Sequence, residues 1–181
     1  PQLSLNQREL QYVTSDEFGE NKETEYIFAS IDRKTLSFTI RLDYNITPEL
    51  TIQYYGQPYF SAGKYTDFKR ITNPQAEDAK NQFVYLTENE HVYNSESDEY
   101  LLSLHDETLT IENPDFNSKF FNSNLVIRWE YIPGSSFYVV WSQSRYNSTD
   151  IGKFNFSDDV NNLFDEKAHN VFLIKFSYRF G

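Results

Sequence analysis

The last stretch of the chain, "NVFLIKFSYRFG", alternates with a period of two, and this alternation constrains the fold more than any other feature of the sequence. From Phe172 to Phe180 every even position is apolar or aromatic, whereas Lys175, Ser177 and Arg179 lie between them. Side chains of a β-strand point alternately to opposite faces, so this stretch predicts a strand with one apolar and one polar side. Such a strand fits a soluble sheet that covers a core, or a transmembrane strand between lipid and a water-filled lumen.

The same alternation recurs upstream, in stretches that are separated by turn signals. Four stretches follow it: "TLSFTIRLDYNI", "LTIQYYGQPYFS", "FFNSNLVIRWEYI" and "SFYVVWSQSRY". Pro48 and Pro133 mark tight turns between them, because proline presets a turn and cannot donate to a strand ladder. We also expect "DRKT" to be a short turn after a strand over "EYIFASI". If "PQLSLNQRELQYV" is a strand as well, the chain has about seven strands that run up and down.

Composition restricts the protein class further. The chain has 16 Phe and 14 Tyr, and aromatic residues with many Asn, Ser and Thr favour strands and polar loops, so we expect an all-β protein. No stretch approaches the ~18 apolar residues that a transmembrane helix needs. A lipid-facing strand uses only every second residue, so a mean hydropathy of -0.66 does not exclude a membrane β-barrel. The net charge of -11 argues against nucleic acid as a partner.

Long and short connections alternate along the predicted meander, so that the long ones fall at one end of the strands and the short ones at the other. Residues 62–119 and 147–169 form long polar connections, whereas 47–49 and 133–135 are short turns. Long extracellular loops and short periplasmic turns are typical of antiparallel up-and-down barrels of the outer membrane. The short "DRKT" turn would lie on the outer side, and the longer connection 13–24 would lie on the periplasmic side. Toward the N-terminus the predicted connections therefore follow this sorting less well.

A barrel assigns roles to the two sets of alternating side chains. Facing the lumen we expect a charged network that either braces the barrel or selects solutes: Arg41, Asp43, Arg128, Glu130, Lys175 and Arg179. Facing lipid, and forming the signal for insertion, we expect Phe172, Ile174, Phe176, Tyr178 and Phe180. Near the short turns we expect an aromatic girdle at the headgroups, made of Tyr44, Trp129 and Tyr131.

No catalytic chemistry is indicated by the sequence. His91, His105 and His169 are scattered without the spacing of metal ligands, and there is no cysteine. The acidic residues at 98–99 and 106–107 lack the pattern of a calcium loop. Nucleotide-binding and nucleophile motifs are absent as well, so we expect no catalytic residue, metal or cofactor and lean against an enzyme.

Several stretches also resemble one known family. "NLVIRWEYIPGSSFYVVWSQSR" is similar to the strand-turn-strand signature near the C-terminus of a Bacteroidetes outer-membrane family, DUF5916. "IDRKTLSFTIRLDYNITPELTIQYYGQPYFSAGKYTDF" and the closing "VFLIKFSYRF" resemble it too. The resemblance implies a C-terminal β-barrel behind an N-terminal, periplasmic domain similar to carbohydrate-binding family 9. Two positions depart from the pattern: Ile132 replaces an arginine, and Gly181 follows the terminal aromatic residue.

Together these observations predict that residues 1–181 are the C-terminal part of one outer-membrane β-barrel domain, with the C-terminus in the periplasm. The chain starts at Pro1 without a methionine or a signal peptide, so we expect a longer precursor. Its partners would be lipid, the missing part of the barrel and other envelope proteins. Its function would be an anchor, scaffold or channel in an envelope assembly, linked to glycan handling through the missing domain. The alternatives are a secreted β-sandwich adhesin or carbohydrate-binding module, and a barrel enzyme with its site in the long connections.

Overall fold

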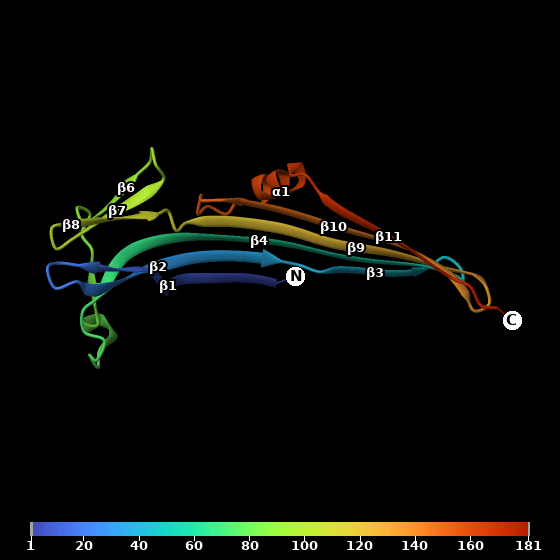
Figure 1. Cartoon of the computed structure of the whole chain (residues 1–181), viewed down its shortest axis with the longest axis horizontal. Coiled ribbons are helices and arrows are strands. Elements are labelled where there is room, and N and C mark those ends of the chain that lie inside the picture. The colour runs from blue at the N-terminus through green and yellow to red at the C-terminus, as the bar shows by residue number, and fades with distance from the viewer. Residues whose placement is uncertain (1, 181) are drawn as a thin grey trace.

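The protein is all-β with antiparallel pairing, as Figure 1 shows for a computed structural model that describes residues 2–180. Pro1 and Gly181 lie outside the described residues. The expectation of a longer precursor depends on Pro1, and the departure from the insertion signal depends on Gly181. One α-helix, α1 (Phe156–Asp165), lies against the main sheet. No helix in residues 2–180 has the length and apolarity to span a membrane.

The main sheet is an antiparallel meander of long strands, and β4 alone has 22 residues. Its strands follow one another in the order β1 (Gln2–Phe18), β2 (Glu23–Ser37), β4 (Leu50–Ile71), β9 (Phe116–Ile132), β10 (Ser135–Thr149) and β11 (His169–Ser177). Two shorter strands, β3 (Ile40–Asn45) and β5 (Phe83–Tyr85), also pair with β4. β3 continues the line of β2, because Ile40 pairs with Gly56 in the same register in which Ser37 pairs with Tyr59.

The sheet is open in the described part of the chain. β1 pairs with β2 alone, and β11 pairs with β10 alone, so each of these strands has one edge without a strand partner within residues 2–180. If β2 and β3 count as one run, six strands cross the sheet, one fewer than the sequence predicts. The meander from "TLSFTIRLDYNI" to "SFYVVWSQSRY" and the final strand are present as predicted.

The predicted turn at "DRKT" is wrong, because residues 32–35 continue inside β2. β2 has a neighbour on each side there, because Thr35 pairs with Ser4 on β1 and with Ser61 on β4. The hydroxyls of Thr35 and Ser61 are 2.9 Å apart, so the polar side chains of this stretch find partners within the sheet. The β1–β2 turn therefore occupies residues 19–22 and lies at the same end as the long connections, whereas we expected residues 13–24 at the opposite end.

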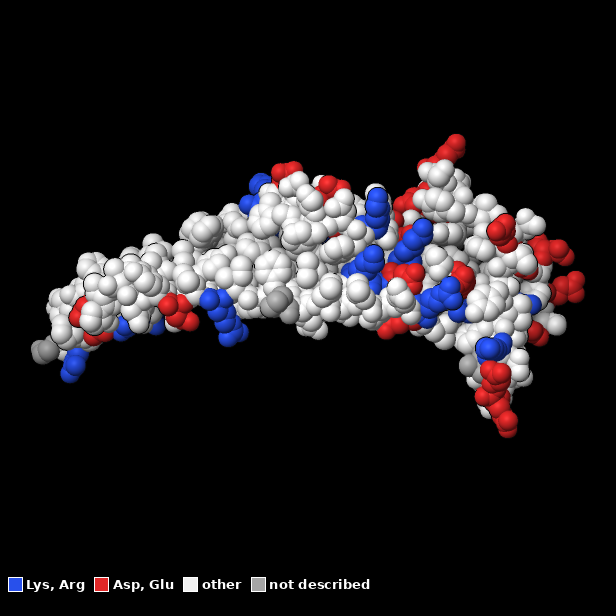
Figure 2. All heavy atoms as spheres, turned by 180° about the vertical axis from the view of Figure 1, so that it is seen from behind, with Lys and Arg blue, Asp and Glu red and all other residues white. Residues whose placement is uncertain are grey.

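The two ends of the sheet differ in their connections (Figure 1). The turns between β3 and β4 and between β9 and β10 meet at one end, which we call the turn end. The connections 72–115 and 150–168 leave the other end, which we call the loop end. The first is shorter than predicted because β4 continues to Ile71 and β9 begins at Phe116. The second is shorter because β10 stays paired with β9 up to Thr149. Asp and Glu side chains gather over the loop end (Figure 2).

A second, three-stranded sheet lies at the loop end. It consists of β6 (His91–Asn94), β7 (Glu99–Leu104) and β8 (Glu107–Glu112), and β7 and β8 form a hairpin inside the stretch expected to be a long polar connection. Its Leu102 and Leu104 pack with Phe18, Ile27 and Phe68 of the main sheet in the larger hydrophobic cluster of the molecule. The core of the described chain therefore sits at the loop end and leaves the turn end without a covering layer.

Candidate functional site: two unlike faces of an open sheet

One face of the sheet carries apolar rows that cross five strands near the turn end. Residues that lie opposite each other on antiparallel neighbours share a face, so the register places Ile52, Ile127, Val139 and Ile174 in one row with Tyr44. With the rows on either side they form what we call the apolar band: Leu42, Tyr44, Leu50, Ile52, Tyr54, Leu125, Ile127, Trp129, Phe137, Val139, Trp141, Phe172, Ile174 and Phe176. Neither hydrophobic cluster in residues 2–180 includes a residue of this band.

The predicted lipid-facing residues and the predicted girdle meet in this band. Phe172, Ile174 and Phe176 belong to it and are 64 to 69% exposed, while Tyr178 and Phe180 follow the end of β11. In the girdle, Tyr44 and Trp129 are members of the band, and the ring of Tyr131 stacks on that of Phe176 at 5.6 Å and contacts Trp129 at 6.0 Å. The structure thus brings Phe172, Ile174 and Phe176 onto one face with the girdle residues, and the contact of this face with lipid stays a prediction.

The opposite face, which we call the polar face, carries uncharged polar side chains between the band residues. It includes Gln53, Tyr55, Asn122, Asn124, Ser142 and Ser144. A trough of about 380 Å³ is lined by Arg41, Asp43, Gln53, Tyr55 and Asn124, and a second trough of similar volume continues toward His169. Val126, Val140 and Leu173 interrupt the polar character of this face near the turn end.

Three of the six predicted lumen residues gather around Tyr138. A guanidinium nitrogen of Arg128 donates to Glu130 at 2.6 Å, and the Arg128 Nε donates to the Tyr138 hydroxyl at 3.2 Å. The Lys175 ammonium lies 5.7 Å from the ring centre of Tyr138. Glu130 also accepts the backbone N–H of Gly134 at 2.9 Å, which ties this group to the β9–β10 turn. Arg128, Glu130 and Tyr138 are thus joined by hydrogen bonds at the turn end of the polar face, with the Lys175 ammonium near the Tyr138 ring.

The other three predicted lumen residues lie apart from this cluster. The Arg41 guanidinium lies 5.6 Å from the ring centre of Tyr55, and Asp43 lines the same trough, but no ion pair joins the two in the described part of the chain. Arg179 follows β11 and packs against the β9–β10 turn, where its backbone N–H donates to the Ser135 hydroxyl at 3.0 Å. The structure therefore divides the predicted network into a cluster of three and three separate residues.

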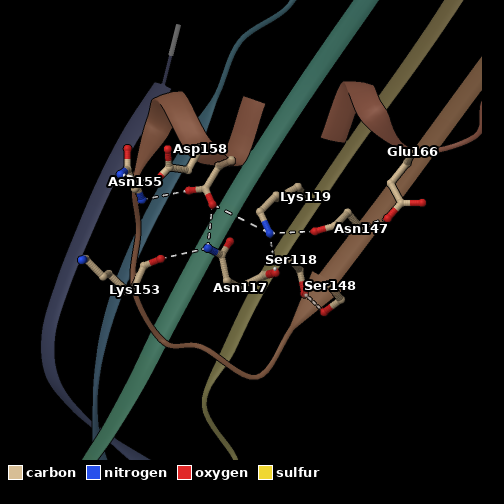
Figure 3. Close-up of polar contacts among 10 residues, drawn as sticks. Asn117, Ser118, Lys119, Asn147, Ser148, Lys153, Asn155, Asp158 and Glu166 are labelled. Carbon is tan, nitrogen blue, oxygen red and sulfur yellow. Dashed lines mark hydrogen bonds and ion pairs between the residues drawn. The ribbon is translucent and has the colours of Figure 1, made fainter. Parts of the chain in front are cut away.

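A buried polar network, which the sequence reasoning missed, fastens α1 to the sheet (Figure 3). The Lys119 Nζ lies 3.8 Å from Asp159 Oδ1, and both side chains are nearly inaccessible, at 1 and 4%. Asp159 also accepts the side-chain amide of Asn117 at 2.7 Å and the backbone N–H of Asn155 at 3.0 Å. Lys119 donates to Asn147 Oδ1 at 2.9 Å. Buried charges persist where partners replace their hydration, and here residues of the strands and of the helix start supply the partners.

A local signal for α1 was present within the predicted loop 147–169. Phe156, Val160 and Leu163 have helical spacing. Asp158 and Asp159 lie in the first turn, where acidic side chains interact favourably with the positive end of the helix dipole. Polar residues outnumber apolar ones over 147–169, which favours the prediction of a loop. The apolar face of the helix is narrow and covers Phe60 and Phe121 of the sheet.

The loop end carries a cleft of about 320 Å³ between the three-stranded sheet and residues 150–153. Its Tyr93 donates to Asp98 at 2.6 Å, a hydrogen bond that raises the pKa of Tyr93 to about 12 and lowers the pKa of Asp98. Burial raises the pKa of Asp115, whose carboxylate accepts the Tyr65 N–H at 2.6 Å. Residues 2–180 contain no group of three or more His, Cys, Asp or Glu placed to hold a metal ion.

Comparison with known proteins gives a family and no function. A family model described as "Domain of unknown function (DUF5916)" matches residues 2–180. No curated protein and no solved structure matches the chain. The features of the molecule that bear on its function are its two unlike faces and its open edges.

Proposed function

Given that the chain belongs to the DUF5916 family over residues 2–180, we propose that it forms part of the wall of an outer-membrane β-barrel. In this proposal the apolar band faces lipid, the polar face lines the lumen and the turn end points to the periplasm. The biochemical role of the wall is to anchor an envelope assembly in the outer membrane. The cluster around Tyr138 braces the lumen side of the barrel.

The observation that carries the proposal is the exposure of the apolar band opposite a polar face. Ile174 and Phe172 are 68 and 69% exposed. The band continues over five neighbouring strands, and its members on β4 and β10 are half-buried between their neighbours. Moving one exposed Ile or Phe side chain out of water contributes ~1.5–3 kcal/mol, so a continuous band of this size strongly favours a nonaqueous surrounding. Monomers in water rarely expose an apolar patch of this extent.

The length of the apolar face along β2 and β3 also supports a hydrocarbon layer as the surrounding of the band. From Leu36 to Ile46 every second residue is apolar, and the constant register against β4 keeps these residues on one face. Ten residues of strand extend ~33 Å, which corresponds to a height of ~25 Å at the usual barrel tilt of ~40°. A hydrocarbon layer of about that thickness is what the outer face of a barrel spans.

The open edges define what the rest of the barrel must provide. In lipid every backbone N–H and C=O needs a protein partner, so β1 and β11 require neighbouring strands on their outer sides. We assign those strands to the same barrel. A β-sandwich adhesin or carbohydrate-binding module would instead need a second sheet over the apolar band, and the second sheet of residues 2–180 packs at the loop end.

The test uses Leu173 and Ile174, two neighbours of equal size on opposite faces of β11. Both are more than half exposed, at 54 and 68%, so in water an arginine at either position has the same small effect. In a barrel, Ile174→Arg places a charge against lipid at a cost of ~2–4 kcal/mol, whereas Leu173→Arg places it in the lumen. We expect I174R in the full-length protein to lower the amount of folded protein in outer membranes severalfold, with L173R close to wild type.

The readout is the band of folded protein on a gel of outer membranes, run with and without boiling. Equal levels of the two variants contradict the proposal, because the two faces of β11 are then equivalent. Recovery of the wild-type protein outside the outer membrane contradicts it independently of any substitution.

A further inference from the structure

α1 lies on the face of the sheet that carries the apolar band, at the place where the band ends. Its Leu163 is fully buried and packs with Phe60 and Phe121 of the sheet. Phe121 is four residues beyond Leu125, the last residue of the band on β9. Ser123, which lies between them on the same face, pairs with Gln143, so the apolar rows have already given way to polar ones there.

Beside Phe60 and Phe121, α1 also covers polar strand residues that share a face with the band. Lys119 and Asn117 on β9 are 1 and 4% exposed beneath the helix, and Asn147 on β10 accepts a hydrogen bond from Lys119. Closer to the band, Arg145 donates to the backbone carbonyls of Phe164 and Glu166 at the C-terminal end of α1. A cation at these carbonyls is favourable because the C-terminal end of a helix carries partial negative charge.

α1 exposes both aromatic and polar side chains, and Phe156 at its N-terminal end is 47% exposed. Phe164, at the end of the helix nearest the band, contacts the ring of Phe121 at 5.3 Å and remains 44% exposed. Asp158, Asn162 and Asp165 are exposed on the helix. Acidic and amide side chains are unfavourable in hydrocarbon. An exposed aromatic ring such as that of Phe164, at the helix end nearest the band, suits the boundary between headgroups and acyl chains.

We propose that α1 marks the outer boundary of the membrane-embedded wall and binds the lipid surface there. Phe164 lies at the level where the acyl chains begin, the exposed polar side chains of α1 face the aqueous phase, and the Lys119–Asp159 network holds the helix in this position. This inference rests on the proposed function, because it requires the apolar band to face lipid. It adds a lipid contact outside the strands and a role for the 150–168 connection.

The experiment measures the depth of three spin labels in the full-length protein, reconstituted in phosphatidylcholine vesicles. The 181 residues contain no cysteine, so single labels at Phe164, Asn162 and Ile174 are unambiguous within this part of the protein. The ratio of collisions with oxygen to collisions with a water-soluble nickel complex reports depth. We expect a ratio severalfold higher at Ile174 than at Asn162, with Phe164 between the two.

The three positions separate failure of the inference from failure of the proposed function. If the ratio at Phe164 equals the ratio at Asn162 or at Ile174 while Ile174 remains in lipid, α1 does not lie at the boundary and the inference is overturned alone. If Ile174 itself is open to the nickel complex, the proposed function fails and the inference fails with it.

A second label keeps the test valid if Phe164→Cys loosens the helix. Lys167 is exposed and lies between α1 and β11, so a label there reports the same end of the helix with Phe164 in place. We expect an intermediate ratio at Lys167 as well. Asp159→Asn in this background removes the ionic partner of Lys119 and should move the ratio toward that of Asn162; an unchanged ratio overturns the role of the network.

Discussion

At the scale of single residues, Lys119 and Asp159 are the two charged side chains that the described chain buries most completely. Their ion pair at 3.8 Å is long, and the amide of Asn117 donates to Asp159 at a shorter distance of 2.7 Å. Desolvation offsets much of what a buried pair gains, so the pair itself adds little to stability. Removing one partner is costly, because the other charge then stays buried without compensation.

We therefore predict that Asp159→Asn destabilises the protein by ~3–5 kcal/mol, the usual cost of breaking a buried pair. Asp158→Asn is the matched control, because Asp158 is also in the first turn of α1 but is exposed, and a carboxylate at the helix N-terminus contributes at most ~1 kcal/mol. The temperature at which the folded band disappears from a gel measures both variants, and protease cleavage within 150–168 reports release of α1. Equal effects of the two substitutions would show that the network does not hold the helix.

At the scale of elements, the β9–β10 turn illustrates how two residues fix a strand pair. Pro133 presets its own φ, and Gly134 has φ +82, a combination that fits the centre of a type II turn. A Cβ on Gly134 would lie 2.7 Å from the Arg179 side chain, so the turn is also in contact with the chain beyond β11. The sequence predicted this turn at the right residues, because Pro-Gly carries its conformational preference locally.

We predict that Gly134→Ala destabilises the protein by more than Gly19→Ala does. Both glycines have positive φ, at which an L side chain costs ~1–2 kcal/mol, but a Cβ on Gly19 meets nothing within 4 Å. The difference between the two variants in the same gel assay therefore reports the displacement of Arg179. If G134A costs no more than G19A, Arg179 does not pack on the turn in the native protein.

At the scale of the whole molecule, the apolar band and the two open edges act together. An unpaired edge strand invites pairing with another chain, and the exposed band adds an apolar surface beside it. We predict that the 181-residue chain, refolded alone in plain buffer, associates into polydisperse species, and that detergent is needed to keep it in small particles. Size-exclusion chromatography with light scattering, together with circular dichroism, measures this; a monodisperse β-protein without detergent would contradict a barrel wall.

The strands with strict alternation could be predicted from the sequence, because a period of two depends only on neighbouring residues. The Pro-Gly turn could be predicted for the same reason. "TLSFTIRLDYNI" and the closing strand are examples, and the family resemblance agrees with the family match over residues 2–180. The interpretation failed where context overrides local preference. "DRKT" has the composition of a turn but stays in β2, because strands on both sides complete its hydrogen bonds.

The sequence by itself therefore determined the two-faced strands, the all-β class and the residues on each face, since these depend on adjacent positions. Only the tertiary structure decided which residues meet across strands. It grouped Arg128, Glu130 and Lys175 around Tyr138 and left Arg41 and Asp43 apart, and it paired Lys119 with Asp159, which are 40 positions away in the chain. Such contacts depend on register and on long connections, which no local pattern encodes.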